Sequence, residues 1–184
     1  MSNISKHLVT KIQNNSIAHA WDEAVKEWEV ADCRVDERES VRCVCREESP
    51  AYLFTIQNKR NHKKIYPISE SCIRKMGRKE LNDATEINIQ LFKLLRAIRE
   101  EKYIELNSEY FTRKLLAYLY EISVFRPTRY NNFNGKNDYL FMLNMFNKRA
   151  KPSENQARKI RAIIANDLKP FLEEKLKEKV RTVS

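Results

Sequence analysis

The distribution of cysteine is the sequence feature that most constrains how this chain folds. All four cysteines, Cys33, Cys43, Cys45 and Cys72, lie within the first 72 of 184 residues. Residues 1–16 lack the apolar core of a secretion signal, so we expect a reducing bacterial cytoplasm as the location. Clustered cysteines in such a compartment indicate a metal site rather than disulfides. The alternative is that all four are reduced thiols that pack as small apolar side chains.

The spacing of three of these cysteines suits a structural zinc ion. Cys43 and Cys45 form a Cys-x-Cys pair, which a tight turn can point at one ion. Cys72 follows Ser69-Glu70-Ser71, a predicted helix start, where backbone N–H groups and the helix dipole stabilise a thiolate. Zn²⁺ prefers four tetrahedral thiolate or imidazole ligands. The sequence therefore predicts Zn²⁺ bound by Cys43, Cys45, Cys72 and one further residue.

Two residues are candidates for that fourth ligand. Cys33 is preferred because it lies on the strand that precedes the pair, and His62, in a polar turn, is the alternate.

His7 and His19 are isolated near the N-terminus and are interpreted as surface groups. The H-x-E and P-C-x-x-C pattern of deaminases and the H-E-x-x-H pattern are both missing, so we assign no catalytic residue and expect no enzyme. A metal-dependent hydrolase would need an open metal position and a general base.

The pattern of apolar residues predicts an α+β fold that is mostly helical. An amphipathic segment within residues 1–28 precedes predicted strands at 28–35, 51–57 and 65–68. The last two strands form a hairpin, and a helix then starts at Ser69 and ends at Gly77. A cysteine knuckle, a hairpin and a helix, in that order, form a treble-clef-like zinc unit. We expect this zinc-binding domain to span residues 1–80.

Residues 81–184 are predicted to form a second, helical domain. Apolar stripes at helical spacing run through 87–98, 111–122 and 139–146. Ser153 and Gln156 form a capping box that starts the last helix, and Pro170 should kink or interrupt it. Only two glycines occur in the chain, which argues against a Gly-rich phosphate loop and a many-stranded barrel. No apolar run approaches the length that spans a bilayer, so no membrane partner is expected.

Four stretches of the first domain together resemble a small zinc module encoded by phages and prophages. They are EWEV (27–30), CVC (43–45), YLFTIQN (52–58) and PISESCIRKM (67–76). The usual form of the module is Cys-x-Cys-Gly, an aromatic strand ending in Asn, and P-I-G-S-x-C-I-x-K-F. This chain has Arg46 where Gly follows the knuckle, Glu70 in place of Gly, and Met76 in place of Phe. The resemblance covers roughly residues 27–77 and implies a phage origin.

Length, charge and the zinc module are also similar to a zinc-containing type II-A anti-CRISPR family of streptococcal prophages. This resemblance implies a non-enzymatic inhibitor that docks on Cas9, or on its RNA complex, and prevents target DNA from loading. The expected partner is therefore a protein. The alternative is a basic accessory protein that binds DNA or RNA in phage replication or regulation.

Positive charge supports either kind of partner. The net charge is +10 and the pI about 9.5, which attracts polyanions. Two clusters carry much of this charge. The first contains Lys59, Arg60, Lys63, Lys64, Arg74, Lys75, Arg78 and Lys79, and the second contains Lys148, Arg149, Lys151, Arg158, Lys159 and Arg161. Either cluster can neutralise phosphates, with Tyr66, Tyr130 and Phe133 as stacking platforms. The alternative is that both are solvated charged faces.

Overall fold

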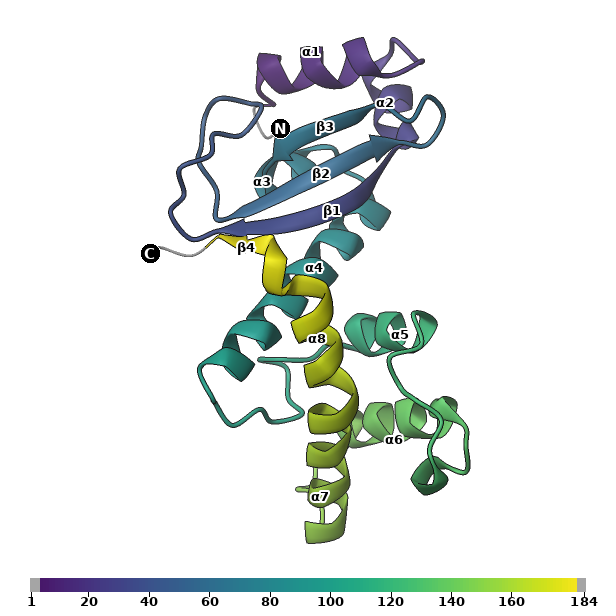
Figure 1. Ribbon diagram of the computed structural model, residues 1–184. Coiled ribbons are helices and arrows are strands. Elements are labelled where there is room, and N and C mark those ends of the chain that lie inside the picture. Colours follow the sequence, from purple (N-terminus) through teal and green to yellow (C-terminus); the bar gives the residue numbers. More distant parts are fainter. Residues whose placement is uncertain (1–3, 182–184) are drawn as a thin grey trace. The chain divides into compact units, whose positions relative to one another are not determined.

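A computed structural model of the chain describes residues 4–181 and shows an α+β protein that is mostly helical (Figure 1). The fold class predicted from the sequence is therefore confirmed. The chain divides into two compact units, one that extends through Ile89 and takes in the chain from Glu178 on, and one formed by Gln90–Lys177. The sequence placed the domain boundary at residue 80. The two units divide inside helix α4 (Lys79–Arg99), between Ile89 and Gln90.

The first unit is built on a small sheet. Its elements are α1 (Lys6–Asn15), α2 (Trp21–Ala24), a 3₁₀ turn (Val25–Glu27), β1 (Trp28–Asp36), β2 (Tyr52–Asn58), β3 (Lys64–Ile68), α3 (Glu70–Lys75), the start of α4, and β4 (Val180–Arg181). The strand order is β3-β2-β1-β4. β2 pairs antiparallel with β1 and β3, whereas β4 pairs parallel with β1. The predicted strands and hairpin are all present, and β4 is additional.

The core of the first unit lies between the sheet and its helices. Phe54, Ile56 and Ile68 on β2 and β3 have no exposed surface, because β-branched and aromatic residues fill the pleated face. α1 contributes Leu8 and Ile12, one turn apart and fully buried. Figure 1 shows α1 alongside β3. The opposite face of α1 is therefore left to solvent.

The second unit is helical. After the end of α4 it contains α5 (Arg113–Glu121), a 3₁₀ turn (Arg129–Asn131), α6 (Gly135–Asn147), α7 (Glu154–Ile163), a π-helical segment (Ile164–Leu168) and α8 (Lys169–Leu176). The predicted stripes of α4 and α5 form its core, with Leu94, Leu95, Leu115 and Leu119 at most 1% exposed. No helix within residues 4–181 combines the length and the apolar character required to cross a bilayer.

Two local predictions for the last helix are confirmed. The Ser153 hydroxyl accepts from the Gln156 N–H at 3.3 Å, and the Gln156 side chain accepts from the Ser153 N–H at 2.9 Å. The helix then widens into the π-helical segment directly before Pro170. Proline has no N–H to donate to the carbonyl four residues earlier, so the regular ladder is interrupted at this point.

Candidate metal centre

The loop between β1 and β2 brings the Cys-x-Cys pair to the sheet. Asp36, at the end of β1, is only 1% exposed and organises the first part of this loop. Its carboxylate accepts hydrogen bonds from the N–H groups of Arg38, Ser40 and Val41 and from the Ser40 hydroxyl. Burial on its own raises the pKa of Asp36, but these hydrogen bonds outweigh it and hold the pKa below its ordinary value. A fixed carboxylate therefore sets the path of the loop towards Cys43.

The knuckle itself is a tight turn. The Cys43 N–H donates to the Glu48 carbonyl at 2.9 Å, and the Arg46 N–H donates to the Cys43 carbonyl at 2.8 Å. Arg46 closes the turn in the left-handed region, with φ of 66°. The Val44 N–H donates to the Pro67 carbonyl at 2.9 Å, which fixes the knuckle against the outer edge of β3.

Cys72 reaches the knuckle from the first turn of α3. Ser69 caps this helix, and its hydroxyl accepts from the Cys72 N–H at 3.2 Å. Gly77 follows the helix with φ of 68°, a conformation that glycine adopts without steric cost. The Sγ atoms of Cys43 and Cys72 lie 3.7 Å apart. The hairpin therefore returns the chain so that residues distant in sequence share one small volume.

Four side chains converge in that volume. Ligand atoms of Cys43, Cys45, Glu48 and Cys72 all lie within 4.8 Å of one another. The three cysteines are at most 2% exposed, and Glu48 is half-buried. This is the one group of three or more His, Cys, Asp or Glu residues in residues 4–181 with the proximity required to hold a metal ion.

The environment of the sulfurs lowers the pKa of one cysteine and raises the pKa of the other two. The Ser69 N–H donates to Cys43 Sγ at 3.3 Å, and the Glu47 N–H donates to Cys45 Sγ at 3.4 Å. The hydrogen-bonded contact between the two sulfurs of Cys43 and Cys72 lowers the pKa of Cys43 to about 5 and raises the pKa of Cys72. Burial raises the pKa of Cys45. Zinc binding at these residues would therefore displace protons from the Cys45 and Cys72 thiols.

The donor set fits Zn²⁺. With Zn–S bonds of about 2.3 Å, neighbouring sulfurs of a tetrahedron lie roughly 3.8 Å apart, which matches the 3.7 Å between Cys43 and Cys72. Three thiolates and one carboxylate would give such an ion four protein ligands. The Glu48 carboxylate also accepts hydrogen bonds from the hydroxyls of Ser69 and Ser71, which orient it.

The fourth residue of the group differs from the one predicted from the sequence. Glu48 lies with the three cysteines, whereas Cys33 and His62 do not join them. Cys33 is buried on β1, two strands from β3, and strands are spaced about 4.8 Å apart. Burial raises the pKa of the Cys33 thiol, so it packs as a small apolar side chain. His62 is exposed in the hairpin turn, at the opposite end of β3 from Cys72.

The two predicted basic clusters are partly neutralised within the protein. In the first, Arg60 pairs with Glu27 at 3.3 Å, Arg74 with Glu70 at 2.7 Å, Lys75 with Glu47 at 3.8 Å and Arg78 with Glu80 at 3.2 Å. In the second, Arg158 pairs with Glu154 at 3.4 Å and Lys159 with Asp138 at 2.8 Å. Lys59, Lys63, Lys64, Lys148, Arg149 and Lys151 are exposed.

Comparison of the chain with protein-family models, curated proteins and solved structures finds no match. The chemistry of the metal centre and of the surface therefore carries the functional argument.

Proposed function

We propose that this is a non-enzymatic binding protein whose first unit is organised by one structural Zn²⁺ held by Cys43, Cys45, Cys72 and Glu48. The observation that carries this proposal is the convergence of these four donors at the junction of knuckle, hairpin and helix. We interpret this junction as treble-clef-like, as the order of knuckle, hairpin and helix in the sequence suggests. Four protein ligands fill a tetrahedral shell, and a filled shell is typical of structural rather than catalytic zinc.

Metal analysis tests the zinc part of the proposal. Protein purified without chelator is expected to contain one zinc per chain, with an X-ray absorption spectrum that fits three sulfur ligands and one oxygen. Folded protein that is free of metal would contradict it, and so would a spectrum with an additional water ligand at the zinc.

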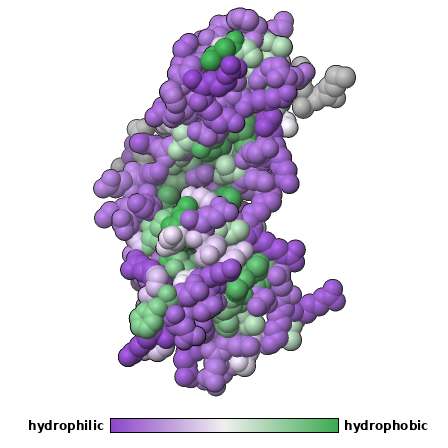
Figure 2. Space-filling view, turned by 90° about the vertical axis from the view of Figure 1, so that its right-hand side faces the viewer, coloured by the Kyte–Doolittle hydropathy of each residue, from purple (hydrophilic) through white to green (hydrophobic). Residues whose placement is uncertain are grey.

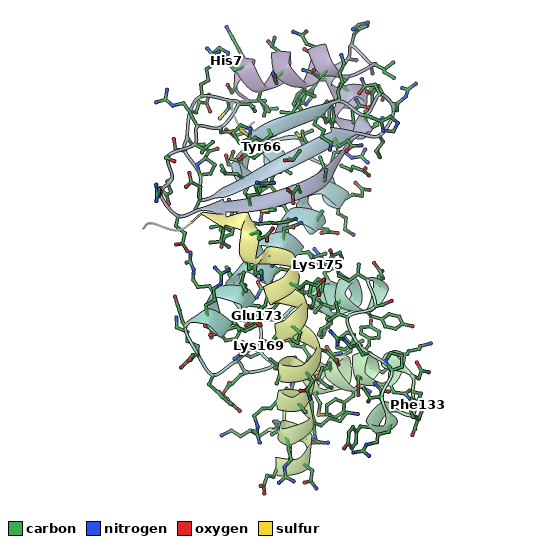
Figure 3. All side chains as sticks on the ribbon, viewed as in Figure 1. His7, Tyr66, Phe133, Lys169, Glu173 and Lys175 are labelled. Atoms are coloured by element: carbon green, nitrogen blue, oxygen red, sulfur yellow. The ribbon has the colours of Figure 1, made fainter. Side chains whose placement is uncertain are left out.

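A binding role is supported by an unusual loop in the second unit. Tyr130 and Phe133 are 76% and 74% exposed, and Figure 3 shows Phe133 in the loop before α6. Phe133 has φ of 55°, an uncommon conformation for a bulky residue. On the face drawn in Figure 2, hydrophilic residues predominate and hydrophobic ones form separate small patches. Exposed aromatic side chains on a defined loop are typical of the contacts that dominate protein interfaces.

The loop is held rigidly by one side chain. Asn131 is 2% exposed, and its amide donates to the Arg126 carbonyl at 2.7 Å and to Asp138 Oδ2 at 2.6 Å. Its amide oxygen accepts from the N–H groups of Thr128 and Asn134 at 2.8 and 3.1 Å. A rigid loop loses little conformational entropy when it docks.

The target proposed for this binding protein is a host defence nuclease, with Cas9 as the specific candidate. This choice rests on the resemblance to phage zinc modules and anti-CRISPR proteins, and the net charge of +10 suits a target that carries RNA. We expect the protein to co-purify with Cas9 bound to its guide RNA and to block loading of target DNA. A Tyr130→Ser/Phe133→Ser variant should bind more weakly, with Tyr103→Ser, another exposed tyrosine, as the control. No recovery with Cas9, with or without guide RNA, would exclude this target.

The alternative proposal, a nucleic-acid-binding accessory protein, is favoured by one observation. Lys148, Arg149 and Lys151 are closely spaced exposed cations in the connection between α6 and α7. This function predicts affinity for bare DNA or RNA that falls steeply with salt. Affinity that does not change with salt would exclude it.

A further inference from the structure

A groove beside the metal centre lies outside both predicted basic clusters. It has a volume of about 790 Å³ and runs between α1 and the knuckle. Cys43 and Val44 form part of its wall, and the other residues that line it are polar or basic. The groove is thus a feature of the first unit that depends directly on the path of the knuckle.

α1 presents one polar face to this groove. His7, Thr10, Lys11 and Asn14 all line it from successive turns of the helix, whereas the opposite face is buried in the core. The Ser5 hydroxyl donates to the Cys45 carbonyl at 3.3 Å, which ties the start of α1 to the knuckle. Figure 3 shows His7 on this helix.

The groove has cationic walls. Lys11 approaches from α1, and Arg42 and Arg46 approach from the knuckle loop, while none of the residues that line the groove is acidic. Within residues 4–181, the side chains of these three cations form no ion pair and no hydrogen bond. By contrast, Arg74 and Lys75, two other cations near the metal centre, each form an ion pair with an acidic residue. Three cations that converge without an internal partner indicate an external anion.

Arg46 lines the groove from the knuckle turn. Its left-handed backbone, with φ of 66°, costs roughly 1 kcal/mol for a residue other than glycine. The Arg46 side chain is exposed and lines the groove. The turn that Arg46 closes sets this backbone conformation and leaves the side chain exposed along the groove.

We propose that this groove binds the phosphodiester backbone of single-stranded nucleic acid. Arg42 and Arg46 supply planar guanidinium groups for phosphate, Lys11 supplies a mobile charge, and Thr10 and Asn14 supply uncharged donors for sugar and phosphate oxygens. A volume of this size suits a small ligand, so it accommodates a nucleotide or two rather than a duplex. The inference rests on the proposed function only for the idea that the target carries nucleic acid. It also predicts that the groove binds strands of nucleic acid without any protein partner.

Binding of a labelled oligonucleotide to the zinc-loaded full-length protein tests this inference. The probe is a fluorescein-labelled RNA or DNA strand of about 12 nucleotides, followed by anisotropy over a range of salt. The variant Lys11→Gln/Arg42→Gln/Arg46→Gln should lose on the order of 10-fold in affinity, and the slope of log K against log salt should fall by about 2, since each phosphate contact on a single strand contributes about 0.7. The matched control, Lys59→Gln/Lys63→Gln/Lys64→Gln, removes the same charge from the hairpin turn and should retain most of the affinity.

Three outcomes would overturn the inference. The first is a wild-type protein that does not bind the strand at low salt, which leaves the zinc site and the nuclease target untouched. The second is equal loss in both triple variants, which indicates attraction by net charge alone. The third is a groove variant that binds the strand normally but loses an acidic peptide such as polyglutamate, which indicates a protein ligand.

A further variant separates binding from folding. Arg42 and Arg46 also lie near a centre that carries three thiolates and a carboxylate, so their removal can weaken metal retention. Zinc content and thermal unfolding are therefore measured on each variant. If the triple variant loses zinc, zinc content and strand binding are measured on His7→Gln/Lys11→Gln, which changes only α1. Normal zinc content with weaker strand binding supports the groove, and unchanged strand binding overturns it.

Discussion

At the scale of single residues, Glu48 is the proposed fourth donor of the metal centre. If Glu48 is a zinc ligand, Glu48→Ala should leave three thiolates and weaken zinc retention by 10-fold or more. Glu48→Cys should instead retain zinc, because a shell of four cysteine thiolates is a common structural zinc site. Competition with a chromogenic chelator measures both changes.

Two controls make the experiment on Glu48 specific. Glu47→Ala removes the neighbouring exposed carboxylate, whose contact with Lys75 at 3.8 Å is a surface ion pair, and should leave zinc affinity unchanged. Cys33→Ala should also leave one zinc per chain, whereas Cys72→Ser should not. Loss of zinc in the Cys33 variant would indicate that Cys33 is a zinc ligand.

Three of the four residues that converge were predicted from the sequence because thiols are rare and their spacing is informative. Cys43, Cys45 and Cys72 stand out in a chain with only four cysteines. Glu48 does not, since acidic residues are abundant and its approach depends on the turn that Arg46 closes. Its one signal is its place in the same loop, three residues after Cys45. The order of strands decides against Cys33, and a strand pattern alone does not reveal that order.

At the scale of secondary structure, the loop before α6 offers a test of rigidity. Asn131→Ala removes the side-chain hydrogen bonds to Arg126, Thr128, Asn134 and Asp138. At about 1 kcal/mol for each hydrogen bond, with some recovered by water, we expect the second unit to lose roughly 2–4 kcal/mol. Hydrogen exchange should show faster exchange in residues 126–138. Asn134→Ala, which changes only the cap of α6, is the milder control, and equal effects in both variants would contradict the role of Asn131.

The π-helical segment between α7 and α8 contains a buried acid whose ionisation is unfavourable. Burial, and then the negative charge of Asp138, raise the pKa of Asp167 above its ordinary value of 3.8. The folded state therefore holds the Asp167 proton more tightly than the unfolded state. Stability from this proton is present below pH 3.8 and is lost as the pH rises through the folded pKa.

Asp167→Asn should therefore stabilise the protein at neutral pH. The variant removes the cost of a buried charge and keeps an amide oxygen as acceptor, so its melting temperature should rise by up to about 5 °C. The difference from wild type should shrink as the pH falls towards 4. Melting curves over a range of pH measure both effects. A variant that is less stable than wild type at neutral pH would show that the attraction to Arg126 outweighs burial.

Elements with local signals were predictable, and those set by packing were not. The strands, the Ser69 and Ser153 caps and the interruption at Pro170 all follow from short patterns. α6 is different. Within the stripe predicted over 139–146, Leu140 is 40% exposed, whereas Met142 is fully buried. Gly135 allows this orientation, since a Cβ at this position would lie 2.1 Å from the Phe125 carbonyl oxygen.

At the scale of the whole molecule, the two units have separate sources of stability. The second unit has its own apolar core, which includes Phe111, Leu116 and Leu172. The first unit is built on a small sheet. The long loop between β1 and β2 contacts α3 through the cysteine cluster. Structural zinc contributes about 10–16 kcal/mol of binding free energy in small zinc domains. Zinc at this centre would therefore stabilise the first unit, and the second unit should not depend on it.

Chelation of the zinc-loaded protein should consequently melt one unit and spare the other. In scanning calorimetry of the full chain, a strong chelator should lower or abolish one transition and leave a second in place. Hydrogen exchange should assign the lost protection to residues 28–77 and the retained protection to 111–176. Cys43→Ser should reproduce the chelated state and should not respond further to chelator. A single transition that shifts as a whole would instead mean that the two units unfold together, because helix α4 belongs to both.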